Sequence, residues 1–248
     1  MDLKVMAAIA VAALAGASHA LAAPGLASKA YEPFVKRGIT EFELRGGRLT
    51  GGAAAGESKA IVEVSHGFSD RLSAGVLAEF EDTPGARRRF EALALEAVVY
   101  LGQLSGTGVD VGGYLEYAQP VHGGVGALEA KLLFARQFGP VHATANLIAE
   151  RPLSQRRHET EFEYVLQGTV DAGGGWNLGA QAFGDLGTSR RFGGRQEHFL
   201  GPVAKFETRP RWMSGELELE AAYLFAAGAA RDETDGQLRF VIEWENRF

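Results

Sequence analysis

The sequence predicts an all-β protein, a transmembrane antiparallel up-and-down β-barrel of about twelve strands, with ten as the alternative. Three observations predict this fold. Apolar and polar residues alternate from residue 38 onward, the connections between strands are alternately short and long, and the last strand is apolar on one face and charged on the other up to a terminal Phe.

The alternation has the period of two residues that is typical of a β-strand with one buried and one wet face. In LSAGVLAEFE, for example, Leu72, Val76 and Phe80 share a face, while Ser73, Glu79 and Glu81 share the other. The same alternation recurs along the chain. It predicts strands near residues 38–46, 57–67, 70–81, 90–101, 108–118, 126–137, 141–151, 160–170, 176–186, 198–208, 214–225 and 237–248.

The connections after even-numbered strands are mostly tight, as in GFSDR and QFGPV, whereas most of those after odd-numbered strands are long and polar, as in GGRLTGGAAAGES and GTSRRFGGRQE. Short turns on one rim and longer loops on the other are typical of outer-membrane barrels. With an even number of strands, both termini are expected on the short-turn side, which faces the periplasm.

The last segment, QLRFVIEWENRF, needs lipid against its apolar row, and only a closed barrel satisfies every backbone group in lipid. It resembles the C-terminal signature of Gram-negative outer-membrane barrels, although Asn246 stands where that pattern usually has Tyr or another hydrophobe. The resemblance is to a class and indicates no subfamily. It implies that Phe248 is a membrane-insertion signal and that the barrel-insertion machinery is a partner.

The N-terminus has the layout of a secretory signal peptide: Lys4, a short apolar run and then small residues. Cleavage is expected after Ala22, with Ala20 and Ala23 as alternatives. An uncleaved anchor is the other interpretation, but the apolar run is shorter than the roughly 20 residues of a membrane-spanning helix. The chain is therefore divided into a signal peptide (1–22), a periplasmic N-terminal segment (23–37) and an outer-membrane barrel (38–248).

Composition narrows the class further. The chain has no Cys, so it has neither a disulfide framework nor a lipid-anchor cysteine. Its net charge of −6 argues against a nucleic-acid partner. A secreted β-sandwich or lipocalin-like barrel is the soluble alternative, but a soluble barrel of this size would have a wide bore to fill.

One face of the strands carries many acids, and in a barrel this face lines the lumen. A low-dielectric wall focuses their field, which predicts a cation-favouring pore. The alternative is that they only solvate the wall and pair across strands. The acids are Glu41, Glu43, Glu79, Glu81, Asp110, Glu116, Glu161, Glu163, Glu216, Glu218, Glu220 and Glu243, with Glu63, Glu96, Glu129, Glu150, Asp185 and Glu245; the bases are Arg45, Lys59, Lys131, Lys205, Arg239 and Arg247.

The predicted extracellular loops carry arginines. They could bind the phosphates of lipopolysaccharide or fold inward over the lumen, and the plainer alternative is solvated loop charge. These residues are Arg87, Arg88, Arg89, Arg156, Arg157, Arg190, Arg191 and Arg195.

The expected function is a porin-like channel for small solutes, with a closed structural or adhesive barrel as the alternative. A lipid-modifying enzyme is the third candidate and would need a Ser and a His brought together on the wall. His66 lies near Ser65 and Ser69 but reads as part of a turn, and His142 could form a polar site with Thr144 and Asn146. We expect no catalytic residues, metal or cofactor. The expected partners are outer-membrane lipid, lipopolysaccharide and an unidentified small solute.

Overall fold

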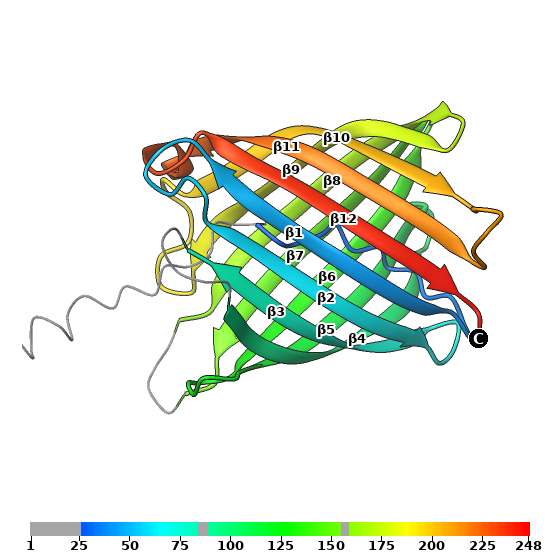
Figure 1. The fold of residues 1–248 in the computed structure, drawn as a ribbon, viewed down its shortest axis with the longest axis horizontal. Coiled ribbons are helices and arrows are strands. Elements are labelled where there is room, and N and C mark those ends of the chain that lie inside the picture. Colours follow the sequence, from blue (N-terminus) through cyan, green and yellow to red (C-terminus); the bar gives the residue numbers. More distant parts are fainter. Residues whose placement is uncertain (1–25, 84–88, 155–158) are drawn as a thin grey trace, which may run out of the picture.

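The computed structural model describes residues 26–83, 89–154 and 159–248, which form a closed antiparallel barrel (Figure 1). Each strand pairs with its neighbours in the chain, and β1 pairs with β12. This confirms the predicted all-β, up-and-down barrel of twelve strands. The strands are β1 (Thr40–Thr50), β2 (Ser58–Gly67), β3 (Leu72–Asp82), β4 (Arg89–Leu104), β5 (Val109–Pro120), β6 (Ala127–Phe138), β7 (Val141–Pro152), β8 (Glu161–Gly173), β9 (Trp176–Thr188), β10 (Glu197–Thr208), β11 (Glu216–Gly228) and β12 (Gly236–Asn246).

The connections confirm the predicted alternation. Those after β2, β4, β6, β8 and β10 leave one rim, which we call the turn end, and those after the odd-numbered strands leave the opposite rim, which we call the loop end. The loop end also carries the 3-10 helix η1 (Ala229–Asp232). Among the described residues, no helix combines the length and the apolar character that a membrane crossing requires.

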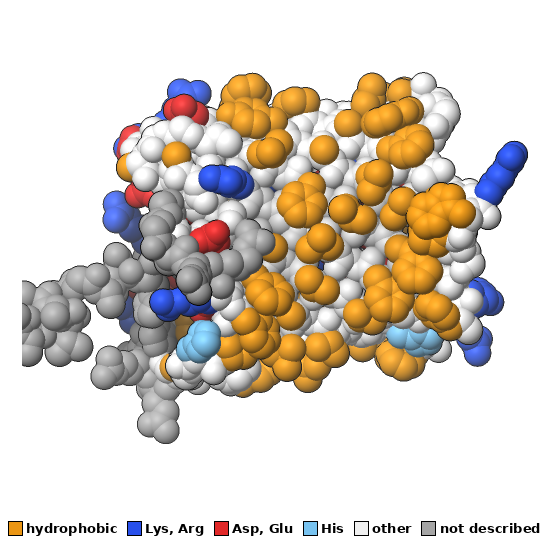
Figure 2. Space-filling view, viewed as in Figure 1, with side chains coloured by type: hydrophobic (Ala, Val, Ile, Leu, Met, Phe, Trp, Pro, Cys, Tyr) orange, Lys and Arg blue, Asp and Glu red, His pale blue; other side chains and the backbone are white. Residues whose placement is uncertain are grey.

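The strand faces are inverted relative to a soluble protein. The outer face carries apolar side chains such as Leu95 and Leu115, which are 58% and 51% exposed. On the face shown in Figure 2, apolar side chains are spread over the middle of the barrel wall. Charged side chains such as Glu43 and Arg45 are only 2% and 3% exposed and lie inside. A continuous apolar exterior around a polar interior requires lipid as the surrounding solvent.

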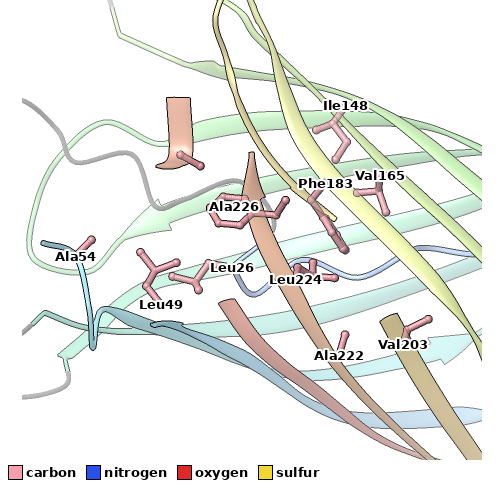
Figure 3. Packing of buried hydrophobic residues seen from close by; sticks show 12 residues of the cluster. Leu26, Leu49, Ala54, Ile148, Val165, Phe183, Val203, Ala222, Leu224 and Ala226 are labelled. Carbon is pink, nitrogen blue, oxygen red and sulfur yellow. The ribbon is translucent and has the colours of Figure 1, made fainter. Parts of the chain in front are cut away.

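The interior is not uniformly polar. Leu26, Leu49, Phe183 and Leu224 belong to a buried apolar cluster that β1, β7 to β11 and the adjoining loop-end segments contribute (Figure 3). This apolar cluster fills one side of the barrel, so the charged groups gather on the other side and toward the two rims.

At the turn end, aromatic side chains surround the C-terminus. The ring of Phe248 lies 6.2 Å from that of Phe42 and 5.9 Å from that of Trp244. Phe248 is 78% exposed, so this end of the chain stays accessible outside the barrel wall.

The described part of the predicted periplasmic segment, residues 26–37, lies inside the barrel and not beyond its rim. Leu26 belongs to the same buried cluster as Leu49 and Ala54 at the loop end, and Lys36 binds Glu245 at the turn end. The chain thus runs through the lumen before β1 begins, as the blue trace in Figure 1 shows. We call residues 26–37 the lumen segment.

The lumen segment also explains the largest difference from the predicted strand boundaries. The sequence predicts that GGRLTGGAAAGES, which starts at Gly46, is a connection, whereas β1 continues to Thr50. A Cβ atom at Gly47 would lie 1.9 Å from the backbone oxygen of Leu26. Gly47 therefore leaves room for the lumen segment and does not form a turn.

Candidate functional site: the barrel lumen

Described residues of the lumen line two cavities that have no lining residue in common. A cavity of about 480 Å³ lies toward the loop end and is lined by side chains such as Glu81 and Glu161. A second cavity of about 240 Å³ lies toward the turn end, next to Lys36 and Glu245. We call them the loop-end cavity and the turn-end cavity.

A layer of buried side chains separates the cavities. Nη1 of Arg45 contacts Glu43 and lies 2.5 Å from Oε2 of Glu63. The Tyr31 ring of the lumen segment packs 4.8 Å from the ring of Tyr114, and Nζ of Lys131 lies 4.2 Å from the Tyr114 ring. We call these six residues the central layer. The lumen segment contributes one of them directly.

Acidic residues occupy directly opposing positions on adjacent strands, and they do so in two rows. The first row lies on β10, β11, β12, β1 and β2 and begins at the turn end. Like charges that face each other across a ladder destabilise a sheet, so these positions are electrostatically costly. The row consists of Glu207, Glu218, Glu243, Glu43 and Glu63.

The second row continues toward the loop end on β4 to β8. The carboxyl groups of Glu63 and Glu96 lie close together across β3, and this contact joins the two rows. Because β8 begins at Glu161, the second row ends at the loop-end rim. The joined rows thus extend over successive strands of the inner wall, from the turn end to the loop end. The second row consists of Glu96, Glu116, Glu129, Glu150 and Glu161.

The basic residues of the wall neutralise only some of these acids. Lys59, Lys131 and Lys205 bind Glu79, Glu129 and Glu218 at 2.6, 2.9 and 2.7 Å. Nine acids and three bases line the loop-end cavity, and eight acids and three bases line the turn-end cavity. Among the described residues, five acids of the loop-end cavity on β7 to β10 have no ion-pair partner. They are Glu150, Glu161, Glu163, Asp185 and Glu197.

Two lysines of the lumen segment supply further positive charge. Nζ of Lys29 lies 3.1 Å from Glu41, 2.5 Å from Glu43 and 3.7 Å from Glu243, and Nζ of Lys36 lies 2.6 Å from Glu245. Partial burial lowers the pKa of Lys36, but the hydrogen bond and the charge of Glu245 raise it above its ordinary value. Glu41, Glu243 and Glu245 are close enough to share a metal ion, yet here the two ammonium groups bind them.

The structure distributes the twelve acids of the sequence hypothesis as follows. The loop-end cavity is lined by Glu79, Glu81, Glu116, Glu161 and Glu163, and the turn-end cavity by Glu41, Glu218, Glu220 and Glu243. Glu43 is buried in the central layer. Asp110 and Glu216 line neither cavity and bind Tyr100 at 2.7 Å and Arg209 at 2.8 Å near the turn end.

Sequence reasoning missed two groups of residues. Glu197 and Glu207 share the parity of Lys205 on β10, so the alternation could have identified them. Lys29, Tyr31 and Glu32 precede the first strand, and no periodicity indicates that they enter the lumen.

The predicted basic loops are only partly described. Arg190 lies 3.4 Å from Glu159, and Arg195 lies 2.8 Å from Asp232, so two of these arginines pair with acids at the loop end. Arg89 and Arg191 are exposed there. Arg87, Arg88, Arg156 and Arg157 lie outside the described residues, as does the predicted signal peptide.

Three histidines, His66, His142 and His198, bind neighbouring polar side chains. His66 pairs with Thr40 at 2.9 Å, and His198 with Tyr164 at 3.2 Å. His142 lies 2.8 Å from Glu32 of the lumen segment. These partners are hydroxyl or carboxylate groups of neighbouring strands and of the lumen segment, and the contacts position those elements against the wall.

Comparison with known proteins gives matches at the level of structure. No protein-family model and no curated protein sequence matches the chain. The COG4313 outer membrane channel from Pseudomonas putida F1 superposes with a TM-score of 0.60 at 12% identity, over 86% of this chain and 97% of that chain. The NanC porin gives 0.55 at 9% identity, over 84% and 99%. The KdgM porin gives 0.52 at 9% identity over the same shares, and it also matches in complex with disordered oligogalacturonate.

These similarities confirm at the level of fold the predicted resemblance to outer-membrane barrels. At such low identity they establish a shared architecture, and the chemistry of this lumen has to be argued from its own residues.

Proposed function

We propose that the protein is a porin-like channel in the outer membrane of a Gram-negative bacterium, and that its lumen favours small cations. The observation that carries the proposal is the pair of joined acidic rows, which runs along the lumen between the two rims. Acidic residues along a pore wall are a common device for selecting cations.

The energetics of facing acids in the loop-end cavity support a solute-related role. Glu150 faces Glu161, and Glu163 faces Asp185, on adjacent strands without an ion-pair partner in the described part of the chain. Such pairs repel each other, and the low-dielectric wall strengthens the repulsion. A cation in the loop-end cavity would relieve it. We therefore expect the cavity to concentrate cations relative to the surrounding solution.

The orientation follows from the rims. Short turns face the periplasm in outer-membrane barrels and longer loops face outward. The turn end would then face the periplasm, and the five acids for which the described part of the chain supplies no ion-pair partner would lie nearest the cell exterior.

The named neighbours support a channel more than an enzyme, because they are described as porins and a channel. The solute need not be shared. Oligogalacturonate, present in one KdgM complex, is a polyanion, and the acids of the present lumen would repel it. A small cationic solute fits this wall better.

A closed structural barrel is the second candidate. The observation that favours it is the central layer, in which Arg45, Tyr31 and Tyr114 separate the two cavities. If the layer never opens, the barrel conducts nothing, and its role would lie in the membrane or at the cell surface.

Conductance separates these candidates. The refolded mature protein is placed in a planar bilayer, and its reversal potential is measured across a salt gradient. We expect a cation-selective current that loses selectivity when Glu150, Glu161 and Glu163 all become Gln. Glu57→Gln is the matched control, since Glu57 lies at the loop end and lines neither cavity. A folded barrel that carries no current, either intact or after removal of residues 26–37, would contradict the channel, and a current without cation preference would contradict the role of the acids.

A further inference from the structure

The lumen segment lies along the path that a solute would take. Its residues Leu26 to Ser28 line the loop-end cavity, and all residues from Lys29 to Lys36 except Pro33 line the turn-end cavity. Tyr31 contributes to the central layer between them. One short piece of chain thus touches both cavities and the barrier.

Side chains of the wall hold this segment. Asn146, with 0% exposure, accepts a hydrogen bond from the Tyr31 backbone N–H at 2.8 Å and donates one to the Tyr31 carbonyl at 2.8 Å. Nε of Arg45 donates to the Ala27 carbonyl at 2.9 Å. Thr144 donates to Glu32 at 2.7 Å. Residues 26–37 belong to no strand, so the segment can leave without breaking the barrel ladder.

The wall is also shaped for the backbone of the segment. The three atoms nearest to a Cβ built at Gly47 all belong to Leu26, the closest being its backbone oxygen at 1.9 Å. A Cβ at Gly67 would lie 2.2 Å from the Lys36 oxygen, and its next neighbours are also atoms of residues 36 and 37. At both ends of the segment, then, the wall lacks a side chain where the segment passes.

A pivot lies where the segment joins the barrel. Gly38 has a φ of +73°, in the left-handed region that glycine adopts readily. Its backbone N–H bonds the carbonyl of Gly67, which fixes the turn-end side of the pivot to β2. Rotation at Gly38 would move residues 26–37 while leaving β1 in place.

We propose that the inner wall is a binding site for an extended basic peptide, that residues 26–37 are its tethered occupant, and that this occupant closes the channel. The inference rests on the proposed channel function. In the closed state, Lys29 covers Glu41, Glu43 and Glu243 of the acidic wall. When the segment leaves, the two cavities join and these acids are exposed to the solute.

Two glycine substitutions test this in the full mature chain. Gly47→Ala and Gly67→Ala each place a methyl group where only the segment lies, so they should expel it and spare the barrel. Overpacking of this size shifts an equilibrium by about tenfold or more, so we expect mean conductance in planar bilayers to rise by at least that factor. Gly113→Ala is the matched control, because nothing lies within 4 Å of its Cβ position.

A deletion and a peptide complete the test. A variant without residues 26–37 should conduct like the glycine variants, and a synthetic peptide with the sequence of residues 26–37 should block it. The same peptide with Lys29→Glu should block much less, because its carboxylate would face three glutamates. Heat-modified electrophoretic mobility checks that each barrel is folded.

The outcomes separate this inference from the channel itself. If the intact protein conducts as well as the deletion variant, the segment does not close the channel, and the channel proposal stands. If the intact protein and the deletion variant both fold and neither conducts, the channel proposal fails. The proposal that residues 26–37 close the channel then fails as well. If the deletion variant conducts but both peptides block it equally, recognition by Glu41, Glu43 and Glu243 is overturned.

Discussion

Replacing Asn146 with Ala should release the lumen segment. Asn146 makes two hydrogen bonds of 2.8 Å to the Tyr31 backbone and is fully buried. The two bonds together contribute about 1–3 kcal/mol, and a buried backbone group left without a partner adds about 1–3 kcal/mol. The variant should therefore lose about 2–6 kcal/mol of segment binding, which raises the released fraction by about 30- to 20,000-fold.

Thiol labelling can measure this release, because the chain has no Cys of its own. In a Pro33→Cys background, the new side chain replaces a fully buried residue of the lumen segment that lies against Gly112 of β5 and lines neither cavity. The thiol reacts with a water-soluble maleimide only when the segment opens, so the labelling rate follows the open fraction. We expect this rate to rise by the factor above in the Asn146→Ala variant.

Asn177→Ala is the matched control, since its side chain binds Glu207 at 3.1 Å at the exposed turn end and does not touch the segment. An unchanged labelling rate in a folded Asn146→Ala barrel would refute the reasoning. The segment would then be held by other contacts, or the introduced thiol would be accessible in the closed state.

Three further predictions follow from the fold. Leu95→Arg places a charge on the lipid face and should cost about 2–4 kcal/mol in urea unfolding from lipid vesicles, whereas Leu95→Met should be nearly neutral. Phe248→Ala removes edge contacts with Phe42 and Trp244, each of which contributes about 0.5–1.5 kcal/mol to the stability of the folded barrel. If Phe248 is an insertion signal, the substitution should slow assembly by the insertion machinery far more than it slows spontaneous refolding. The raised pKa of Lys36, which faces Glu216, Glu243 and Glu245, means that its hold on the segment is complete below about pH 10.4 and is lost as pH rises beyond it. Single-channel recordings should then show openings that increase only above that pH, and an earlier increase, or the same profile in Lys36→Met, would contradict this.

The sequence was sufficient to predict the barrel, because the position of a strand and the face on which each side chain lies both depend on residues close together in the chain. A period of two sorts Leu238, Phe240 and Ile242 from Arg239 and Glu243 whatever their neighbours are. The structure keeps this sorting, with the first three side chains exposed on the outer face and Arg239 buried. The same alternation assigned the acids to the inner face without any knowledge of pairing.

The sequence could not predict which acids face each other on neighbouring strands. Glu150 and Glu161 lie on neighbouring strands, but only the pairing of β7 with β8 sets them opposite each other. A shift by one residue would turn one of them toward the lipid. The closure of β1 on β12 likewise joins Glu43 to Glu243, which are far apart in the chain.

By itself, then, the sequence determined the strands, their two faces, the two kinds of rim and the charge of the inner wall, because each depends on residues close together in the chain. Only the tertiary structure decided that residues 26–37 lie inside the lumen. The signal was present in Gly47, but its meaning depends on Leu26, which approaches it only after the barrel has closed. In the sequence, a glycine suggests a turn, whereas in the fold the missing side chain leaves space for another segment. The sequence does not reveal this, because contacts between segments that are distant in the chain have no local periodicity.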